Sequence, residues 1–364
     1  MRAHILDFLT WAQKKRNVRI VIHAGANKTG STAIQNACAE HRKTLAKAGI
    51  FYPSVGSATN HNMLLPAILD DEEFRGNLNR SNAEGRAASI VKSEELWTQF
   101  AEDLTNNECD TVLLSSEFVL GLRPNSFERL LKRLRAFSND FHAVVYVRDP
   151  CDHYLSSAQQ ILKYGAAVKD PRNVQNFAQK IRMTEKYLPG RVTLRVFSRD
   201  KLHRGDITLD FLKVALGEKR SANVNVVPMV SNTSLSAEGM ALLRKFNRVV
   251  WGNRRVVGSA VNKELLKAIS EEEEKGSYNK PKLLPDIREV VMRCNIEDVR
   301  RLRDDYGVVF EKFDYDVVSL TEFSVEEDAR LSNLEVSDIV ECDPDLVEHL
   351  TFRVMAKYLR AAAR

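Results

Sequence analysis

Short apolar runs, each followed by a stretch of helical periodicity, fill the first two-thirds of the chain. Four runs predict buried strands, at residues 18–23, 111–115, 143–147 and 192–197. One clear helical pattern follows each run, at residues 31–48, 126–137, 152–162 and 206–216. Runs of Val, Ile and Leu that alternate with helices are typical of a parallel sheet with both faces covered. We therefore predict an α/β fold with a central parallel sheet flanked by helices.

The chain after residue 232 shows helical patterns only. They lie at residues 237–250, 263–274 and 285–306. Residues 324–345 carry eight acidic side chains against one basic side chain, which indicates a solvated linker. A last helix follows, with Asp343 as its N-cap and Pro344 in its first turn. The pattern thus predicts a helical C-terminal region behind the α/β core.

These patterns divide the chain into four parts. The parts are an amphipathic N-terminal helix at residues 1–17, the α/β core at 18–232, a helical subdomain or cap at 233–323, and the acidic linker with the last helix at 324–364. No run approaches the roughly 20 apolar residues that a membrane-spanning helix needs. The basic end of the last helix leaves three docking partners open: the body of the protein, a second subunit, or a membrane surface. The oligomeric state is left open as well.

Composition and charge narrow the classes of ligand. The chain has 364 residues, of which 44% are hydrophobic, enough for a large core. Its net charge of +5 is not gathered into a basic stripe, so we expect an anionic ligand and no nucleic acid. The five cysteines are scattered, and no two are spaced as Cys-x-x-Cys. We therefore expect reduced thiols, a cytoplasmic location and no bound metal.

The turn after the first predicted strand has the composition of an anion-binding loop. Gly25 and Gly30 bracket Lys28, and Ser31 and Thr32 open the next helix. Glycine lets the backbone approach a ligand, and a helix N-terminus adds about half a positive charge. An ordinary turn with a surface lysine explains the same residues and stays open on spacing alone. His23, at the end of the strand, is predicted to be a packing residue.

The loop differs from the P-loop of nucleoside triphosphatases. Gly25 and Gly30 have the P-loop separation, but Ser31 stands where the P-loop lysine belongs and Lys28 lies upstream of the second glycine. A lysine at position 28 would approach the transferred group from a different side than the P-loop lysine does. The sequence therefore gives little support for transfer from a nucleoside triphosphate with magnesium. The predicted fold is therefore P-loop-like. We expect its loop to hold a ligand that is related to a nucleoside triphosphate but distinct from it.

Two motifs together resemble a known family. The segment Lys-Thr-Gly-Ser-Thr at residues 28–32 resembles the 5′-phosphosulfate loop of sulfotransferases that use 3′-phosphoadenosine 5′-phosphosulfate (PAPS), in the form common among bacterial carbohydrate sulfotransferases. After the third predicted strand, Arg148 and Ser156 resemble the 3′-phosphate motif of the same family. A guanidinium offers phosphate a bidentate fork, and a hydroxyl adds a further hydrogen bond. The two motifs follow in the expected order, each at a strand-to-helix turn.

The resemblance implies a reaction and assigns roles to residues. It implies in-line, metal-independent transfer of a sulfuryl group from PAPS to a hydroxyl or amine of a glycan, glycolipid or related acceptor. Lys28 would stabilise the charge that develops on the leaving oxygen. The loop residues that would hold the 5′-phosphate are Lys28, Thr29, Gly30, Ser31 and Thr32. Arg148 and Ser156 would hold the 3′-phosphate.

The general base is left open between two residues. Glu117 follows the second predicted strand, where many carbohydrate sulfotransferases carry a catalytic glutamate. His61 lies in a polar segment and has an ordinary pKa suited to proton transfer. Each has an alternative as a plain surface residue. Two other functions also stay open: a P-loop kinase-like phosphoryl transferase, and a non-catalytic nucleotide-binding member of the fold.

Overall fold

The computed structural model describes residues 18–56, 58–77, 85–228, 234–252, 254–256 and 258–362. The chain forms two compact units. The first comprises Met1–Arg148 and Phe177–Ser231, and the second comprises Asp149–Asn176 and Asn232–Arg364. The predicted N-terminal helix at residues 1–17 lies outside the described residues. Residues 149–176, which the sequence analysis assigned to the α/β core, group with the second unit.

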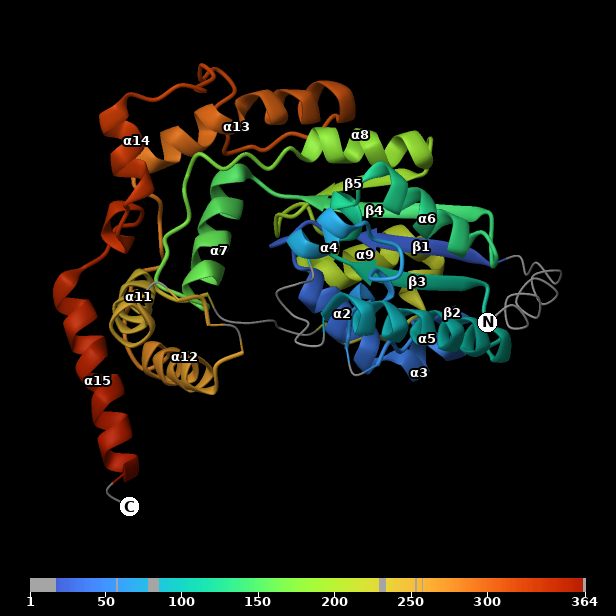
Figure 1. Ribbon diagram of the computed structural model, residues 1–364, viewed down its shortest axis with the longest axis horizontal. Coiled ribbons are helices and arrows are strands. Elements are labelled where there is room, and N and C mark those ends of the chain that lie inside the picture. The colour runs from blue at the N-terminus through green and yellow to red at the C-terminus, as the bar shows by residue number, and fades with distance from the viewer. Residues whose placement is uncertain are drawn as a thin grey trace. The chain divides into compact units, whose positions relative to one another are not determined.

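The first unit is built on a five-stranded parallel sheet in the order β2-β3-β1-β4-β5 (Figure 1). The strands are β1 (Arg19–Ala24), β2 (Ile50–Phe51), β3 (Thr111–Ser116), β4 (Asp140–Val147) and β5 (Val192–Val196). The predicted α/β class and all four predicted strands are confirmed. The sequence missed β2 because two residues are too short to show a pattern.

Helices cover both faces of this sheet. The longer ones are α2 (Ser31–Glu40), α3 (Arg42–Lys47), α4 (Asp71–Asn77), α5 (Gly85–Asn106), α6 (Pro124–Leu134), α8 (Phe177–Tyr187) and α9 (Ile207–Leu216). The short ones are α10 (Glu218–Ala222), η1 (Asn62–Leu64), η2 (Val119–Gly121) and η3 (His203–Gly205). The predicted helix at 31–48 is interrupted at His41, which separates α2 from α3. Apolar side chains of α2, α3 and α9 pack on one face around Val21, Leu113 and Val144.

The topology puts a switch point at the central strand. The chain leaves β1 toward β2 on one side, whereas it passes from β3 across β1 to β4 on the other side. Since such crossovers are right-handed, the helices after β1 and after β3 lie on opposite faces. In parallel sheets, ligands bind at the carboxyl ends of the strands where the connections diverge in this way. The site is therefore expected where β1 and β3 end.

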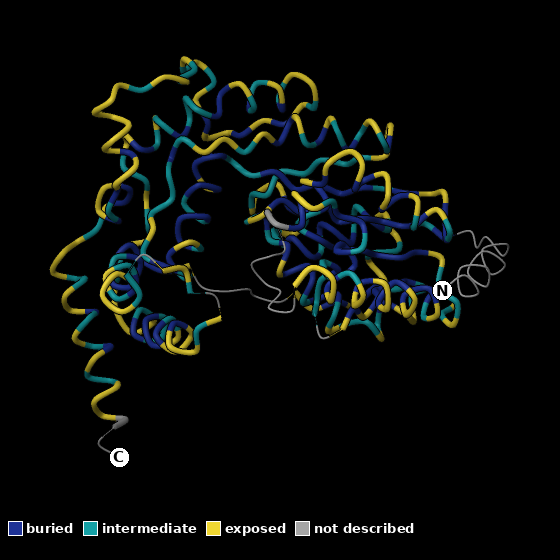
Figure 2. The backbone as a smooth tube through the Cα atoms, in the orientation of Figure 1, coloured by how far each residue is buried: buried dark blue, intermediate teal, exposed yellow. Residues whose placement is uncertain are grey.

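The second unit contains helices and no named strand among its described residues. They are α7 (Pro150–Leu162), α11 (Ala237–Trp251), α12 (Ala260–Glu273), α13 (Pro285–Tyr306), α14 (Val325–Ser332), η4 (Val336–Asp338) and α15 (Pro344–Ala362). Buried side chains of these helices form a core cluster that includes Tyr154, Met240, Ile269 and Val291. Figure 2 shows buried backbone positions along the same helices. The predicted helical region is confirmed. No described helix of either unit is long and apolar enough to cross a bilayer.

The acidic segment at residues 324–345 is not the solvated linker that its charge predicted. Ser324 and Glu327 form a reciprocal capping box that starts α14. Leu331, Leu334 and Ile339 are buried in the core of the second unit, with at most 4% of their surface exposed. The acids lie on the outside of a folded segment whose apolar residues are too widely spaced to stand out in the sequence. The predicted N-cap of α15 is confirmed, since Asp343 Oδ1 accepts a hydrogen bond from the N–H of Asp345 at 2.9 Å.

Candidate functional site

The connection from β1 to α2, residues 25–30, forms a tight loop that we call the glycine loop. Lys28 and Gly30 both adopt left-handed backbone conformations, with φ of 68° and 81°. This conformation costs a residue with a side chain roughly 1–2 kcal/mol, so the loop is strained at Lys28. Between them the buried Thr29 donates from Oγ1 to the carbonyl of Ala26 at 2.7 Å. Since Gly30 is the N-cap of α2 and has no side chain, no side chain caps the start of this helix.

The interior of the glycine loop is lined by two buried side chains. A Cβ atom at Gly25 would lie 2.4 Å from Ser31 Oγ, 2.9 Å from His23 Cε1 and 3.2 Å from His23 Nε2. A side chain at this position would force Ser31 and His23 to move, so glycine is favoured here. The hydroxyl of Ser31 and the edge of the His23 ring both lie against the main chain of Gly25. Together with the N-terminus of α2 and the charge of Lys28, they form a cradle suited to an anion.

Arg148 connects the end of β4 to the glycine loop. Its Nη1 donates a hydrogen bond to the main-chain carbonyl of Lys28 at 3.0 Å. The guanidinium lies over the ring of Phe197, 5.3 Å from the ring centre, and Phe197 also closes against Gly30. The two basic residues that the sequence singled out are thus brought together at one edge of the sheet.

Glu117 lies at the same edge, directly after β3. Its carboxylate is half-buried, and burial raises its pKa above the ordinary value, while the positive charge of Lys28 lowers it by a smaller amount. Because the charge of Lys28 affects the pKa of Glu117, the ammonium and carboxylate groups lie within electrostatic range of each other. A carboxylate with a raised pKa next to an anion cradle is suited to accept a proton.

His61 occupies a position that differs from the exposed, polar one expected. It is 3% exposed, and its ring packs edge-on against Tyr52 at 4.7 Å between centres. Its Nδ1 accepts from the N–H of Ser115 at 2.9 Å, and its Nε2 donates to the carbonyl of Pro53 at 3.2 Å. Burial lowers its pKa to about 4. With both ring nitrogens bonded to the main chain, His61 fastens the segment after β2 to β3, which favours Glu117 as the base.

Three polar residues behind the glycine loop were not singled out from the sequence. His23 was predicted to be a packing residue, but its Nε2 has no hydrogen-bond partner among the described residues although the side chain is fully buried. Its Nδ1 lies 2.7 Å from Ser115 Oγ, which also accepts from Gln35 Nε2 at 3.2 Å. The sequence held one signal for His23: it is the only polar side chain in the apolar run from Ile20 to Ala24, and this run ends directly before Gly25.

Ser156 and Thr32 are the predicted ligand residues with the least structural support. Ser156 is half-buried on α7, in the second unit, so its pairing with Arg148 stays a prediction. Thr32 is exposed in the first turn of α2. Ser31 is buried, and its Oγ lies 3.5 Å from the carbonyl of Ala26.

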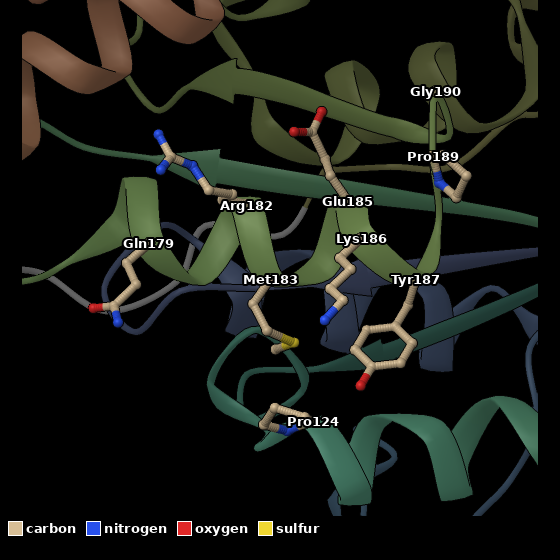
Figure 3. Close-up of a pocket in the computed structure, with 9 residues that line it drawn as sticks. All are labelled: Pro124, Gln179, Arg182, Met183, Glu185, Lys186, Tyr187, Pro189 and Gly190. Carbon is tan, nitrogen blue, oxygen red and sulfur yellow. The ribbon is translucent and has the colours of Figure 1, made fainter.

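A separate open pocket lies along α8. Its volume is about 740 Å³, and its lining includes Pro124, Arg182, Met183, Lys186 and Tyr187. Figure 3 shows Met183, Lys186 and Tyr187 pointing to the side of Pro124, and Arg182 pointing the other way. None of the residues predicted for the site lines this pocket. It is a neighbouring feature of the first unit and not part of the cradle.

Comparison of the chain with protein-family models and with curated proteins finds no match. Among the described residues, no group of histidine, cysteine, aspartate and glutamate side chains is arranged to hold a metal ion. The feature that points to a function is the cradle, with Lys28, Arg148 and Glu117 at the carboxyl edge of the sheet.

Proposed function

We propose that the protein is a PAPS-dependent sulfotransferase of the bacterial carbohydrate type. The observation that carries the proposal is the hydrogen bond from Arg148 to the carbonyl of Lys28, because it joins the two predicted phosphate-binding turns. A ligand with two phosphate groups on one nucleoside needs two cationic sites at short range. A kinase or other triphosphate enzyme would instead need its lysine next to the helix, where this chain has Ser31.

The residues of the cradle fit the 5′ end of such a nucleotide. The main chain of Gly25 lies against the Ser31 hydroxyl and the edge of the His23 ring, and Gly30, the N-cap of α2, has no side-chain cap. These groups are donors of the kind that phosphate and sulfate oxygens accept. Thr29, Gly30, Ser31 and Thr32 would supply main-chain and hydroxyl contacts, and Arg148 would hold the 3′-phosphate. The contribution of Ser156 to that phosphate stays a prediction from the sequence.

PAPS supplies a sulfuryl group whose bond to the bridging phosphate oxygen breaks as a new bond forms to the acceptor oxygen, leaving adenosine 3′,5′-bisphosphate. Lys28 holds its positive charge where negative charge grows on the leaving oxygen. Glu117 takes the proton that the acceptor hydroxyl loses, and its raised pKa helps it do so. His61 holds β3 and its following segment in place.

The acceptor belongs to a broad class in this proposal: a hydroxyl or amine of a glycan, glycolipid or related molecule. A cytoplasmic location agrees with five cysteines that form no disulfide in the structure. Two alternatives compete with transferase activity. A kinase-like enzyme would prefer ATP with magnesium, and a non-catalytic member of the fold would bind the nucleotide without turnover.

The test incubates the protein with sulfur-labelled PAPS and a panel of glycans and glycolipids, and follows label transfer. We expect transfer to at least one acceptor, with kcat lowered by about 10²–10³ in Lys28→Ala and Glu117→Gln. Lys43→Ala and Glu128→Gln, which alter exposed side chains on α3 and α6, are the matched controls and should keep full activity. Transfer that survives both site changes would remove the assigned roles.

Ligand-induced melting separates the alternatives. Adenosine 3′,5′-bisphosphate should raise the melting temperature of the sulfotransferase, and ATP with magnesium should not. Stabilisation by ATP with magnesium alone would favour the kinase-like function. Stabilisation by the bisphosphate with no transfer to any acceptor would favour a binding protein.

A further inference from the structure

The buried histidine at the end of β1 has one ring nitrogen that is used and one that is not. His23 is 0% exposed, and its Nδ1 lies 2.7 Å from the hydroxyl of Ser115. Its Nε2 is buried without a hydrogen-bond partner in the described part of the chain. A buried polar atom without a partner is costly, so such atoms are rare and call for a reason. The unpaired nitrogen points to the glycine loop, 3.2 Å from where a Cβ on Gly25 would lie.

The hydrogen bonds behind the ring favour one tautomer of His23. Gln35 Nε2 donates to Ser115 Oγ at 3.2 Å. The hydroxyl proton of Ser115 can then be donated to His23 Nδ1, which lies 2.7 Å away. In that arrangement the neutral ring carries its own proton on Nε2, the nitrogen that faces the loop. Donation then runs from Gln35 to Ser115 to His23.

The surroundings keep this ring neutral. Tyr146 from β4 and Phe211 from α9 pack against it, with ring centres 5.9 and 5.4 Å away. Burial lowers the pKa of His23 to about 3 and raises that of Tyr146, the titratable ring beside it. The His23 side chain thus offers a neutral N–H donor to the loop. A neutral N–H can donate a hydrogen bond to an anion without burying a charge of its own.

We propose that His23 is an anion-binding residue of the glycine loop, donating its Nε2 proton to a phosphate-type oxygen held at the N-terminus of α2. Ser115 and Gln35 are positioning residues that fix the tautomer. The inference deepens the proposed function and rests on it only for the identity of the ligand. The chemistry that it requires is an oxyanion, whether on a nucleotide or free.

Calorimetric titration with two probes tests this role. The probes are adenosine 3′,5′-bisphosphate and inorganic pyrophosphate, and the variants are His23→Phe and His23→Gln. We expect His23→Phe to weaken binding of both probes by about ten- to a hundredfold, the range for a hydrogen bond to a charged group. His23→Gln should recover part of the affinity, because its amide N–H can replace the ring N–H.

His142→Gln is the matched control for a histidine on the same sheet. His142 is half-buried on β4, paired in register with Val21, and its Nε2 lies 2.8 Å from Thr193 Oγ1. This position is away from the carboxyl edge, so the affinity for both probes should stay within about twofold of the wild type. The comparison separates a direct contact from a general loss of sheet stability.

Nitrogen NMR of ¹⁵N-histidine-labelled protein supplies a readout that a structural role would not move. The resonance pair lost in His23→Phe identifies His23 and should show the proton on Nε2. Adding pyrophosphate to the wild type should shift Nε2 more than Nδ1. Gln35→Leu, which removes the donor to Ser115, should yield a mixture of both tautomers and weaker binding.

The outcomes distinguish this inference from the proposed function. If the wild type binds the bisphosphate and His23→Phe binds it equally well, or if the NMR shows the proton on Nδ1, the role of His23 is overturned and the sulfotransferase proposal stands. If pyrophosphate binds in a His23-dependent manner and the bisphosphate does not bind, the inference stands and the nucleotide is wrong. Binding of neither probe overturns both. Should His23→Phe not fold, the resonance pair lost in His23→Gln identifies His23, and the wild-type NMR decides.

Discussion

Arg148 donates a hydrogen bond to the main-chain carbonyl of Lys28, and the residue that receives it is held in a left-handed conformation, with φ of 68°. The guanidinium of Arg148 therefore binds the main chain at the strained residue of the loop, at the carboxyl edge of the sheet. Strained residues persist where surrounding contacts hold them, and they concentrate at functional sites. The bond thus links the shape of the glycine loop to the end of β4.

The first prediction concerns the planar fork of Arg148. Arg148→Lys keeps the charge but loses the fork that can bind the Lys28 carbonyl and a phosphate together, so we expect the Kd for adenosine 3′,5′-bisphosphate to rise about tenfold or more. Arg148→Met should weaken binding further. The control is Arg191→Met, which breaks an exposed ion pair with Asp140 and should leave the Kd unchanged. Equal affinity in Arg148→Lys and wild type would argue against bidentate recognition.

The second prediction separates stability from function at Lys28. Lys28→Gly relieves the left-handed strain, so the free energy of unfolding should stay level or rise by up to ~1 kcal/mol. Binding of the bisphosphate and sulfuryl transfer should nonetheless be lost with the ammonium group. Urea unfolding and calorimetry measure the two effects on the same sample.

Arg204→Gly provides the comparison for Lys28→Gly. Arg204 is exposed and also has a positive φ, of 55°. Its replacement should change stability in the same direction and leave binding intact. A Lys28→Gly protein that binds the nucleotide normally would contradict the role given to the lysine charge.

The third prediction is a pH profile governed by Glu117. A general base works in its ionised form, and burial raises the pKa of Glu117, so kcat should rise with pH through that raised pKa and then level off. Since the charge of Lys28 lowers this pKa, the rising limb of the residual activity in Lys28→Met should move to higher pH. Lys28→Arg, which keeps the charge, should leave the limb where it is. A flat profile in the wild type would exclude Glu117 as the base.

The sequence predicted the sheet and the loop because both depend on local pattern. Buried strands such as residues 143–147 are continuous apolar runs, and the spacing of Gly25, Lys28 and Gly30 is read within one turn. The meeting of Lys28 and Arg148 was predicted only through the resemblance and the rule that parallel strands end at one edge. The structure brings the two residues together by a bond to a main-chain carbonyl, which no side-chain pattern reveals.

What the sequence did not predict depends on long-range packing. His61 stands among polar neighbours, so its burial against Tyr52 and β3 follows only from the fold. His23 packs against Tyr146 and Phe211, as predicted, but its polar partners Gln35 and Ser115 come from other elements and could not be predicted locally. The buried leucines of residues 324–345 are masked in the sequence by the acids around them.

The last prediction follows from two histidines that the fold keeps neutral. Burial lowers the pKa of His61 to about 4 and that of His23 to about 3, from an ordinary value of 6.5. Between those values and pH 6.5 the unfolded chain binds protons that the folded chain does not, so stability falls as the pH drops. Each histidine should cost about 1.4 kcal/mol per pH unit in that window, or ~2 kcal/mol between pH 7 and pH 5.

His61→Gln tests this account through the slope of stability against pH. The variant loses one titrating group, so its free energy of urea unfolding should fall by ~2 kcal/mol less than that of the wild type between pH 7 and pH 5. His142→Gln should change the slope less, because His142 is half-buried. Glu117 acts in the opposite direction, since a carboxyl with a raised pKa gains stability on acidification. An unchanged slope in His61→Gln would mean that the ring is already charged, or solvated, in the folded protein, and would reopen its candidacy as the base.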